Sequence, residues 1–177
     1  MKTLNFKQKL LGAVALLALV STTESYAQGT SQNLDVTAEV PSLCIIDVPT
    51  SATVLDFDLS GLATATLPFE NSVSIAWRCS LNTLLTIEIS AGVSGNALLR
   101  EMRDGGNSLA YNLYTDATYA LIWDDGSGVG GTGVVTGTGG GMNSIGSSDV
   151  FGRVLLAAAQ DAPVGLYSDT VTVTLEF

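Results

Sequence analysis

The chain has 177 residues and a formal net charge of −10 at pH 7, and it contains no histidine. A chain this acidic repels phosphate backbones and anionic lipid, which argues against nucleic acid and membrane surfaces as partners. Without histidine, a Ser-His-Asp triad, a Cys-His pair and a histidine-ligated metal site are all excluded.

The first 27 residues have the pattern of a secretory signal peptide. Three lysines precede an apolar run of 11 residues, Leu10 to Val20, and a polar stretch then ends in Ser25-Tyr26-Ala27, with small residues three and one before a cut after Ala27. A membrane-spanning helix needs about 18 or more apolar residues, so an anchor is the weaker interpretation and we expect no stable membrane insertion. Cleavage leaves 150 residues with four arginines, no lysine and 16 acids, a net charge of −12.

Residues 31–40 form the first stretch of the remaining chain with the periodicity of a β-strand. Leu34, Val36, Ala38 and Val40 alternate with polar residues, and Pro41, which lacks a ladder N–H, follows. The stretch is either the first strand of a complete domain, paired within the same chain, or a separate strand in front of the domain. Alternation alone does not separate these interpretations.

The two cysteines, Cys44 and Cys79, follow this stretch. In an exported protein an even number of cysteines predicts a disulfide, and a metal site is disfavoured because there is no histidine and no third cysteine. Closing a loop of this length stabilises a fold by roughly 4 kcal/mol in the chain-entropy model.

Period-2 alternation dominates the rest of the chain, and turn signals such as Ser60-Gly61 and Asp104-Gly105-Gly106-Asn107 separate the runs. Short strands with frequent turns predict an all-β, antiparallel sandwich or barrel in a single domain. The best helical candidate, Ala97 to Arg103, is two turns at most. The predicted strands are residues 44–48, 73–79, 85–89, 109–113, 118–123, 150–156 and 171–177.

Ten glycines fall among the 23 residues from Gly126 to Ser148. Glycine at this density disfavours regular structure, so we predict a long flexible hairpin loop between strands that end near Trp123 and begin near Val150. Gly126, Gly128 and Gly131 match G-x-G-x-x-G, but no helix follows, so the match does not indicate a dinucleotide site.

The chain lacks the residues of a catalytic site, and we expect no enzyme, no cofactor and no metal. The carboxylate pairs Asp56/Asp58 and Asp124/Asp125 lie at turn signals and are interpreted as solvated turns rather than as a glycosidase pair. Trp77 is in phase with Val73, Ile75 and Cys79, so we expect it to fill the core beside the disulfide. Trp123 borders the glycine-rich segment and is also favoured as a core residue.

Several short motifs follow one another along the chain: Cys44, Leu55-Asp56-Phe57, Ser74 to Cys79, Ile87 to Gly92, Leu109 to Asp116, Trp123 to Gly126, Phe151-Gly152-Arg153, Gly165 to Thr174 and Phe177. In this order they resemble the Spore Coat Protein U domain family, which includes the subunits of archaic chaperone–usher pili. The terminal G-x-Y-x-D-T-V-x-V-x, together with the cysteine pair, is the most specific part. Departures are Asp58, where the family tends to have glycine, and Asp124, where it tends to read W-G-D-G.

The resemblance implies an immunoglobulin-like β-sandwich that lacks one strand. A periplasmic chaperone would supply the missing strand first, and at an outer-membrane usher the N-terminal extension of another subunit, a copy or a relative, would replace it. Residues 28–42 would then be the extension and 43–177 the domain. Leu34, Val36, Ala38 and Val40 would be the donated side chains.

The same resemblance assigns the strand that borders the groove and faces the chaperone to Val171, Val173, Leu175 and Phe177. The function implied is a structural subunit, shaft or adaptor, of a pilus or coat on the cell surface, with adhesion or biofilm formation as its setting. The alternative is a secreted carbohydrate-binding or adhesin module that uses Trp123, Tyr119, Asp124 and Asp125.

Overall fold

The computed structural model of the chain describes residues 29–47, 51–126 and 133–177. The predicted signal peptide, residue 48 of the first predicted strand and part of the glycine-rich segment lie outside these ranges. The chain divides into two units, residues 1–37 and 38–177. In the first unit, residues 29–37 carry no strand or helix and are exposed. Within the described ranges, no helix is long and apolar enough to cross a membrane.

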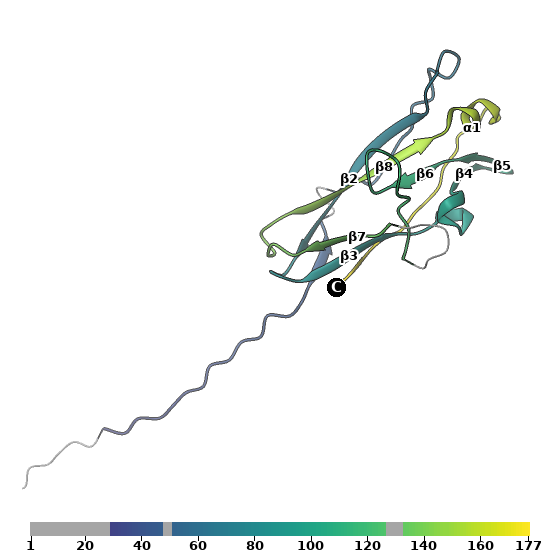
Figure 1. Cartoon of the computed structure of the whole chain (residues 1–177). Coiled ribbons are helices and arrows are strands. Elements are labelled where there is room, and N and C mark those ends of the chain that lie inside the picture. The colour runs from purple at the N-terminus through teal and green to yellow at the C-terminus, as the bar shows by residue number, and fades with distance from the viewer. Residues whose placement is uncertain (1–28, 48–50, 127–132) are drawn as a thin grey trace, which may run out of the picture. The chain divides into compact units, whose positions relative to one another are not determined.

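The second unit is an antiparallel β-sandwich (Figure 1). One sheet has the order β1-β2-β8-β6, the other has the order β7-β3-β9, and β4 and β5 form a separate hairpin. The strands are β1 Cys44–Ile46, β2 Phe69–Cys79, β3 Leu84–Ile89, β4 Glu101–Asp104, β5 Asn107–Ala110, β6 Asn112–Tyr114, β7 Val135–Thr138, β8 Gly146–Val154 and β9 Val173–Glu176. The helical elements are the 3-10 turns η1 Gly92–Ser94 and η2 Ala97–Leu99 and the helix α1 Leu156–Asp161.

The alternation in the sequence sets the two faces of β2 and β3. On β2, Ile75, Trp77 and Cys79 are buried in the core, and on β3 Leu85, Ile87 and Ile89 are buried in the same way. Because successive side chains of a strand point to opposite faces, these two apolar rows face each other between the sheets. The predicted core position of Trp77 is confirmed.

The strand prediction was wrong in two places. Residues 118–123 form a turn, in which Tyr119 has a φ of 58°, and only isolated bridges at Ile122 and Trp123. The segment predicted as a long loop contains β7 and the first residues of β8. The predicted donor segment, residues 34–40, forms no strand with its own chain.

Candidate functional site

An open groove of about 1130 Å³ lies along the second unit. Protein interiors are close-packed, so a groove of this size between the two sheets leaves apolar side chains without the neighbours that a closed core would give them. The groove is lined by residues from both sheets, from the β4–β5 hairpin, from α1 and from two irregular segments. These residues are Ile46, 51–57, Leu59, Leu62, Val73, Ile75, Ile89, Met102, Leu109, Tyr111, Leu113, Val150, Ala159 and 162–173.

The first wall of the groove is the segment 51–57, which follows β1. It is anchored to β2 at its start, where the Ala52 backbone N–H donates to the Ser74 carbonyl oxygen at 2.9 Å. Beyond that bond it has no strand structure. Leu55 and Phe57 lie over Gly152 of β8, where an added Cβ would stand 2.8 Å and 2.7 Å from their side chains. This wall is therefore held by side-chain packing more than by a ladder of backbone bonds.

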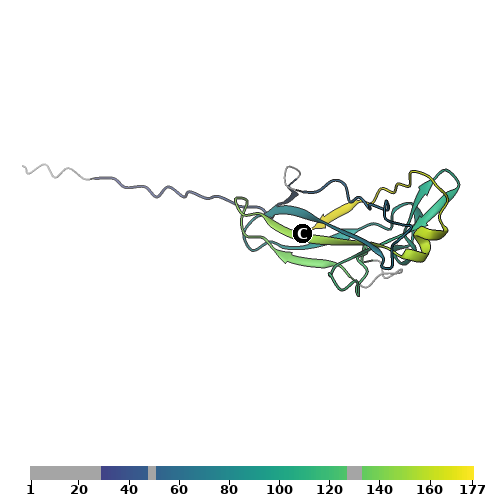
Figure 2. The same cartoon turned by 90° about the horizontal axis from the view of Figure 1, so that it is seen from above.

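The second wall is the C-terminal segment 162–173, which runs from α1 toward the C-terminus (Figure 2). It leads into β9, which lies at the edge of its sheet with β3 as its neighbour. Ser168 exchanges two backbone hydrogen bonds with Arg103 of β4, at 2.8 and 3.1 Å. The segment is thus bonded on the side of β3 and β4 and borders the groove on its other side.

The groove has an apolar floor and apolar side chains at its mouth. Val73, Ile75 and Val150 from one sheet and Ile89 from the other form part of the floor. At the mouth, Val54 is 73%, Val164 is 102% and Leu166 is 86% exposed. Exposed apolar surface next to an unpaired strand edge is what a partner strand covers.

The structure places two of the four residues of the predicted groove strand in the lining of the groove. Val171 and Val173 line the groove and pack against the core. Leu175 packs against the same core, whereas Phe177 is 57% exposed and lies outside the groove lining.

The predicted donor side chains are exposed. Leu34, Val36 and Val40 are 86%, 85% and 86% exposed, and Ala38 is exposed as well. An apolar side chain gains about 1.5–3 kcal/mol from burial, so three large apolar residues alternating on one exposed segment are typical of a strand that binds a partner.

The predicted disulfide between Cys44 and Cys79 is confirmed and joins β1 to the end of β2. Next to it, Ser80 fixes the start of the domain. Its backbone N–H donates to the Leu43 carbonyl oxygen at 2.8 Å, and its Oγ donates to the Pro41 carbonyl oxygen at 3.0 Å. Residues 41–43 are therefore held as a continuation of β1.

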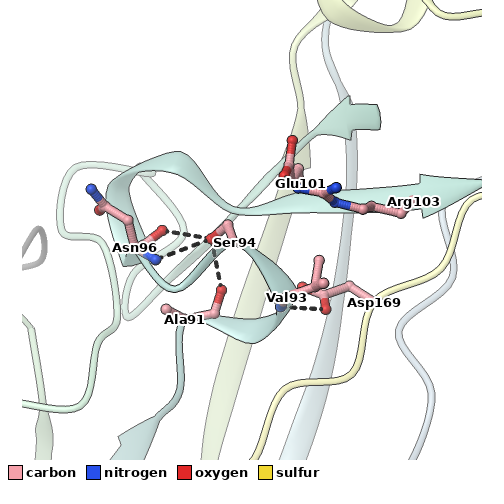
Figure 3. Close-up of polar contacts among 7 residues, drawn as sticks. All are labelled: Ala91, Val93, Ser94, Asn96, Glu101, Arg103 and Asp169. Atoms are coloured by element: carbon pink, nitrogen blue, oxygen red, sulfur yellow. Dashed lines mark hydrogen bonds and ion pairs between the residues drawn. The ribbon is translucent and has the colours of Figure 1, made fainter. Parts of the chain in front are cut away.

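Sequence reasoning missed a polar contact beneath the second wall. Asp169 accepts three hydrogen bonds, from the Tyr111 hydroxyl at 2.6 Å, the Val93 backbone N–H at 2.9 Å and the Thr170 backbone N–H at 2.7 Å. Figure 3 shows the bond between Asp169 and Val93, next to the ion pair of Glu101 with Arg103. Burial, reinforced by the bond to Asp169, raises the pKa of Tyr111 well above its ordinary value, so the hydroxyl remains a donor. The aspartate at the fifth position of the G-x-Y-x-D motif was the available signal.

A second missed residue is Arg100, which is fully buried. Its guanidinium donates to the backbone carbonyl oxygens of Ser90, Ile89, Ala97 and Trp123 and to Asn112 Oδ1, at 2.7 to 3.4 Å. Burial lowers its pKa. Arg100 thus satisfies the carbonyl groups where β3 ends and the chain turns into η1 and η2.

The residues of the alternative sugar site are not assembled into a binding surface. Trp123 is 0% exposed and its Nε1 donates to the Ile87 carbonyl oxygen, which confirms its core position. Asp124 is 3% exposed, so the interpretation of this acid as part of a solvated turn was wrong. Tyr119 lies apart from the groove lining, in ring contacts with Tyr114 and Phe151.

The family model of the Spore Coat Protein U domain matches residues 30–174. One similar solved structure is the complex of the chaperone CsuC with the tip adhesion subunit CsuE from archaic Csu pili of Acinetobacter baumannii, at 21% identity and a TM-score of 0.49. That match covers 78% of this chain and 40% of that chain. A second is a chaperone–usher pilus studied for rod uncoiling, at 14% identity and a TM-score of 0.44, covering 85% and 96%. No curated protein sequence matches.

Proposed function

Since the chain belongs to the Spore Coat Protein U domain family, we propose that it is a structural subunit of a surface pilus or coat that assembles by strand donation. The single observation that supports this most is the pairing of two features in one chain. One is a sandwich with an open apolar groove beside an edge strand, and the other is an exposed alternating segment. The groove has apolar surface that a strand would cover, and the segment has apolar side chains that such a groove would bury.

The donated segment would be residues 28–42, with Leu34, Val36, Ala38 and Val40 facing the groove of a neighbouring subunit. Backbone hydrogen bonds to the second wall would supply affinity, and the alternate side chains would supply specificity. Burial of the three large side chains and Ala38 would contribute something like 5–10 kcal/mol before the cost of ordering. The domain from residue 43 to 177 would be the acceptor.

The route of assembly follows from the same groove. An empty groove exposes apolar surface, so the subunit needs a periplasmic chaperone that covers it after export, before an outer-membrane usher brings the next subunit. Surface display as a fibre or coat, and not catalysis, is the role we propose.

The test compares residues 28–177 with a form that lacks residues 28–41, both produced in an oxidising periplasm. We expect unheated samples of the longer form to run as a ladder of multimers on a gel, to collapse on heating, and to elute as multimers in size exclusion. The shorter form should give no ladder. Two full-length variants provide matched controls: Val36→Asp on the apolar face should abolish the ladder, and Asp35→Asn on the polar face should keep it.

A stable monomer from both forms would contradict the proposal. It would mean that the sandwich needs no strand from a neighbour, and a binding module would then be the better interpretation.

A further inference from the structure

The second wall of the groove keeps its position although the strand that would pair with it is missing. An edge segment without a sheet neighbour on one side lacks half of its backbone bonds and tends to fray. From Gly165 to Thr172 the wall lies outside the regular strands, and it is bonded at two places, where Ser168 bonds Arg103 and where Thr172 bonds Ser90. Something other than a full ladder therefore holds it.

We propose that Asp169 and Tyr111 form a clamp that holds the second wall in the strand-accepting position before the donor strand arrives. The inference rests on the proposed function and assigns Asp169 and Tyr111 as positioning residues for strand capture.

Three elements meet at the clamp. Asp169 comes from the wall itself, Val93 from η1 after β3, and Tyr111 from the residue between β5 and β6. Tyr111 is 9% exposed and lines the groove, so its ring is part of the floor while its hydroxyl bonds the wall. A carboxylate that accepts three hydrogen bonds, one of them from a buried hydroxyl, is a strong fixed point in an otherwise irregular segment.

The surroundings are shaped to admit this carboxylate. Gly92 has a φ of 67°, a conformation that favours glycine, and an added Cβ there would stand 2.0 Å from Asp169 Oδ2. Gly165, at the start of the wall, would carry a Cβ 2.1 Å from Asp104 Oδ2. Two glycines thus let carboxylates approach the backbone closely at both places.

The clamp predicts a kinetic effect. If the wall occupies the accepting position only part of the time, the association rate of a donor strand falls by that fraction. Once the strand is bound, it supplies the missing ladder, and the clamp matters less. Loss of the clamp should therefore slow association and leave dissociation almost unchanged, whereas a merely structural defect would destabilise free and bound forms alike.

The experiment uses residues 28–177 carrying Val36→Asp and Val40→Asp, which prevent donation but keep the whole chain. A fluorescent peptide of residues 31–42 is the probe, and association and dissociation are followed by polarisation. We expect Tyr111→Phe to slow association about threefold and Asp169→Ala about tenfold or more, with dissociation changed less than twofold. Tyr114→Phe, a tyrosine outside the groove lining, is the matched control and should bind like the parent.

Hydrogen exchange of the free proteins provides a second readout that needs no peptide. The backbone amides of Ser168 and Thr172, which donate to the Arg103 carbonyl oxygen and to Ser90 Oγ, should exchange faster in Tyr111→Phe and Asp169→Ala, and those of β3 should not. Unchanged wall exchange together with unchanged association in both variants would overturn the clamp. If the parent itself fails to bind the peptide, the proposed function fails, and the exchange data alone still decide whether the clamp holds the wall.

Discussion

Single buried side chains contribute much of the stability of a domain whose core is open on one side. Arg100 is the clearest case, because its guanidinium serves four backbone carbonyl groups and one side-chain amide without an ion pair among the described residues. Removing a buried donor leaves each acceptor without its partner, and each such loss costs about 1–3 kcal/mol.

We therefore expect Arg100→Met to lower the free energy of unfolding by about 5 kcal/mol or more. Urea unfolding of the donation-blocked full chain, followed by tryptophan fluorescence, measures the loss. Arg103→Met is the matched control: its side chain is 49% exposed and pairs with Glu101, so its loss should stay below about 1 kcal/mol. Equal losses in the two variants would show that Arg100 contributes no more than a surface cation.

Strands with clear alternation of apolar and polar residues could be predicted from the sequence. Turns that are closed by hydrogen bonds between a side chain and the backbone could not. β2 and β3 appear where Val73 to Cys79 and Leu85 to Ile89 alternate. Residues 118–123 are apolar enough for a strand. However, the Asp116 carboxylate accepts the backbone N–H groups of Thr118, Ala120 and Leu121 and closes a turn instead.

The glycine-rich segment was misjudged because glycine there serves packing more than flexibility. A Cβ on Gly137 of β7 would stand 3.1 Å from the Trp77 ring, and one on Gly139 would stand 2.1 Å from the Ser80 carbonyl oxygen. Composition alone does not distinguish a glycine that allows close approach from one in a loose loop. The groove was predictable only through the family resemblance. The contact between Asp169 and Tyr111 was not predictable, because the two residues are distant in sequence.

The short connection between the donor segment and the domain explains why the chain would donate to a neighbour and not to itself. Only Pro41, Ser42 and Leu43 separate Val40 from Cys44, about 10 Å of extended chain, and Ser80 holds two of their carbonyl groups. No residue is left to make the reversal that insertion into the same groove requires.

Lengthening this connection should convert the multimer into a monomer. We expect about twelve Gly/Ser residues inserted between Val40 and Pro41 to give a coil that spans roughly 20 Å, long enough for the donor segment to fold back. Unheated gels and size exclusion measure the change. The same insertion after Thr30, ahead of the donor segment, is the control and should keep the ladder. A ladder in both variants would mean that the connection does not prevent insertion in cis.

At the level of the whole molecule, subunits that must meet repel one another. After removal of the predicted leader each subunit carries a net charge of −12. This charge includes Asp35 and Glu39, which lie on the donor segment that approaches the neighbouring subunit. Like-charged molecules associate faster when salt screens them, since the screening length falls from about 20–30 Å near 0.02 M to roughly 4 Å near 0.5 M.

We therefore expect multimer formation by residues 28–177 to speed up several-fold between about 0.02 and 0.5 M NaCl, because charge opposes encounter more than it stabilises the product. Timed samples on unheated gels give the rate. Neutralising the donor segment with Asp35→Asn and Glu39→Gln should raise the rate at low salt and flatten its salt dependence. If both forms accelerated equally, the salt would be acting on apolar burial and the electrostatic explanation would be wrong, and a rate that fell with salt would point to attraction between oppositely charged surfaces.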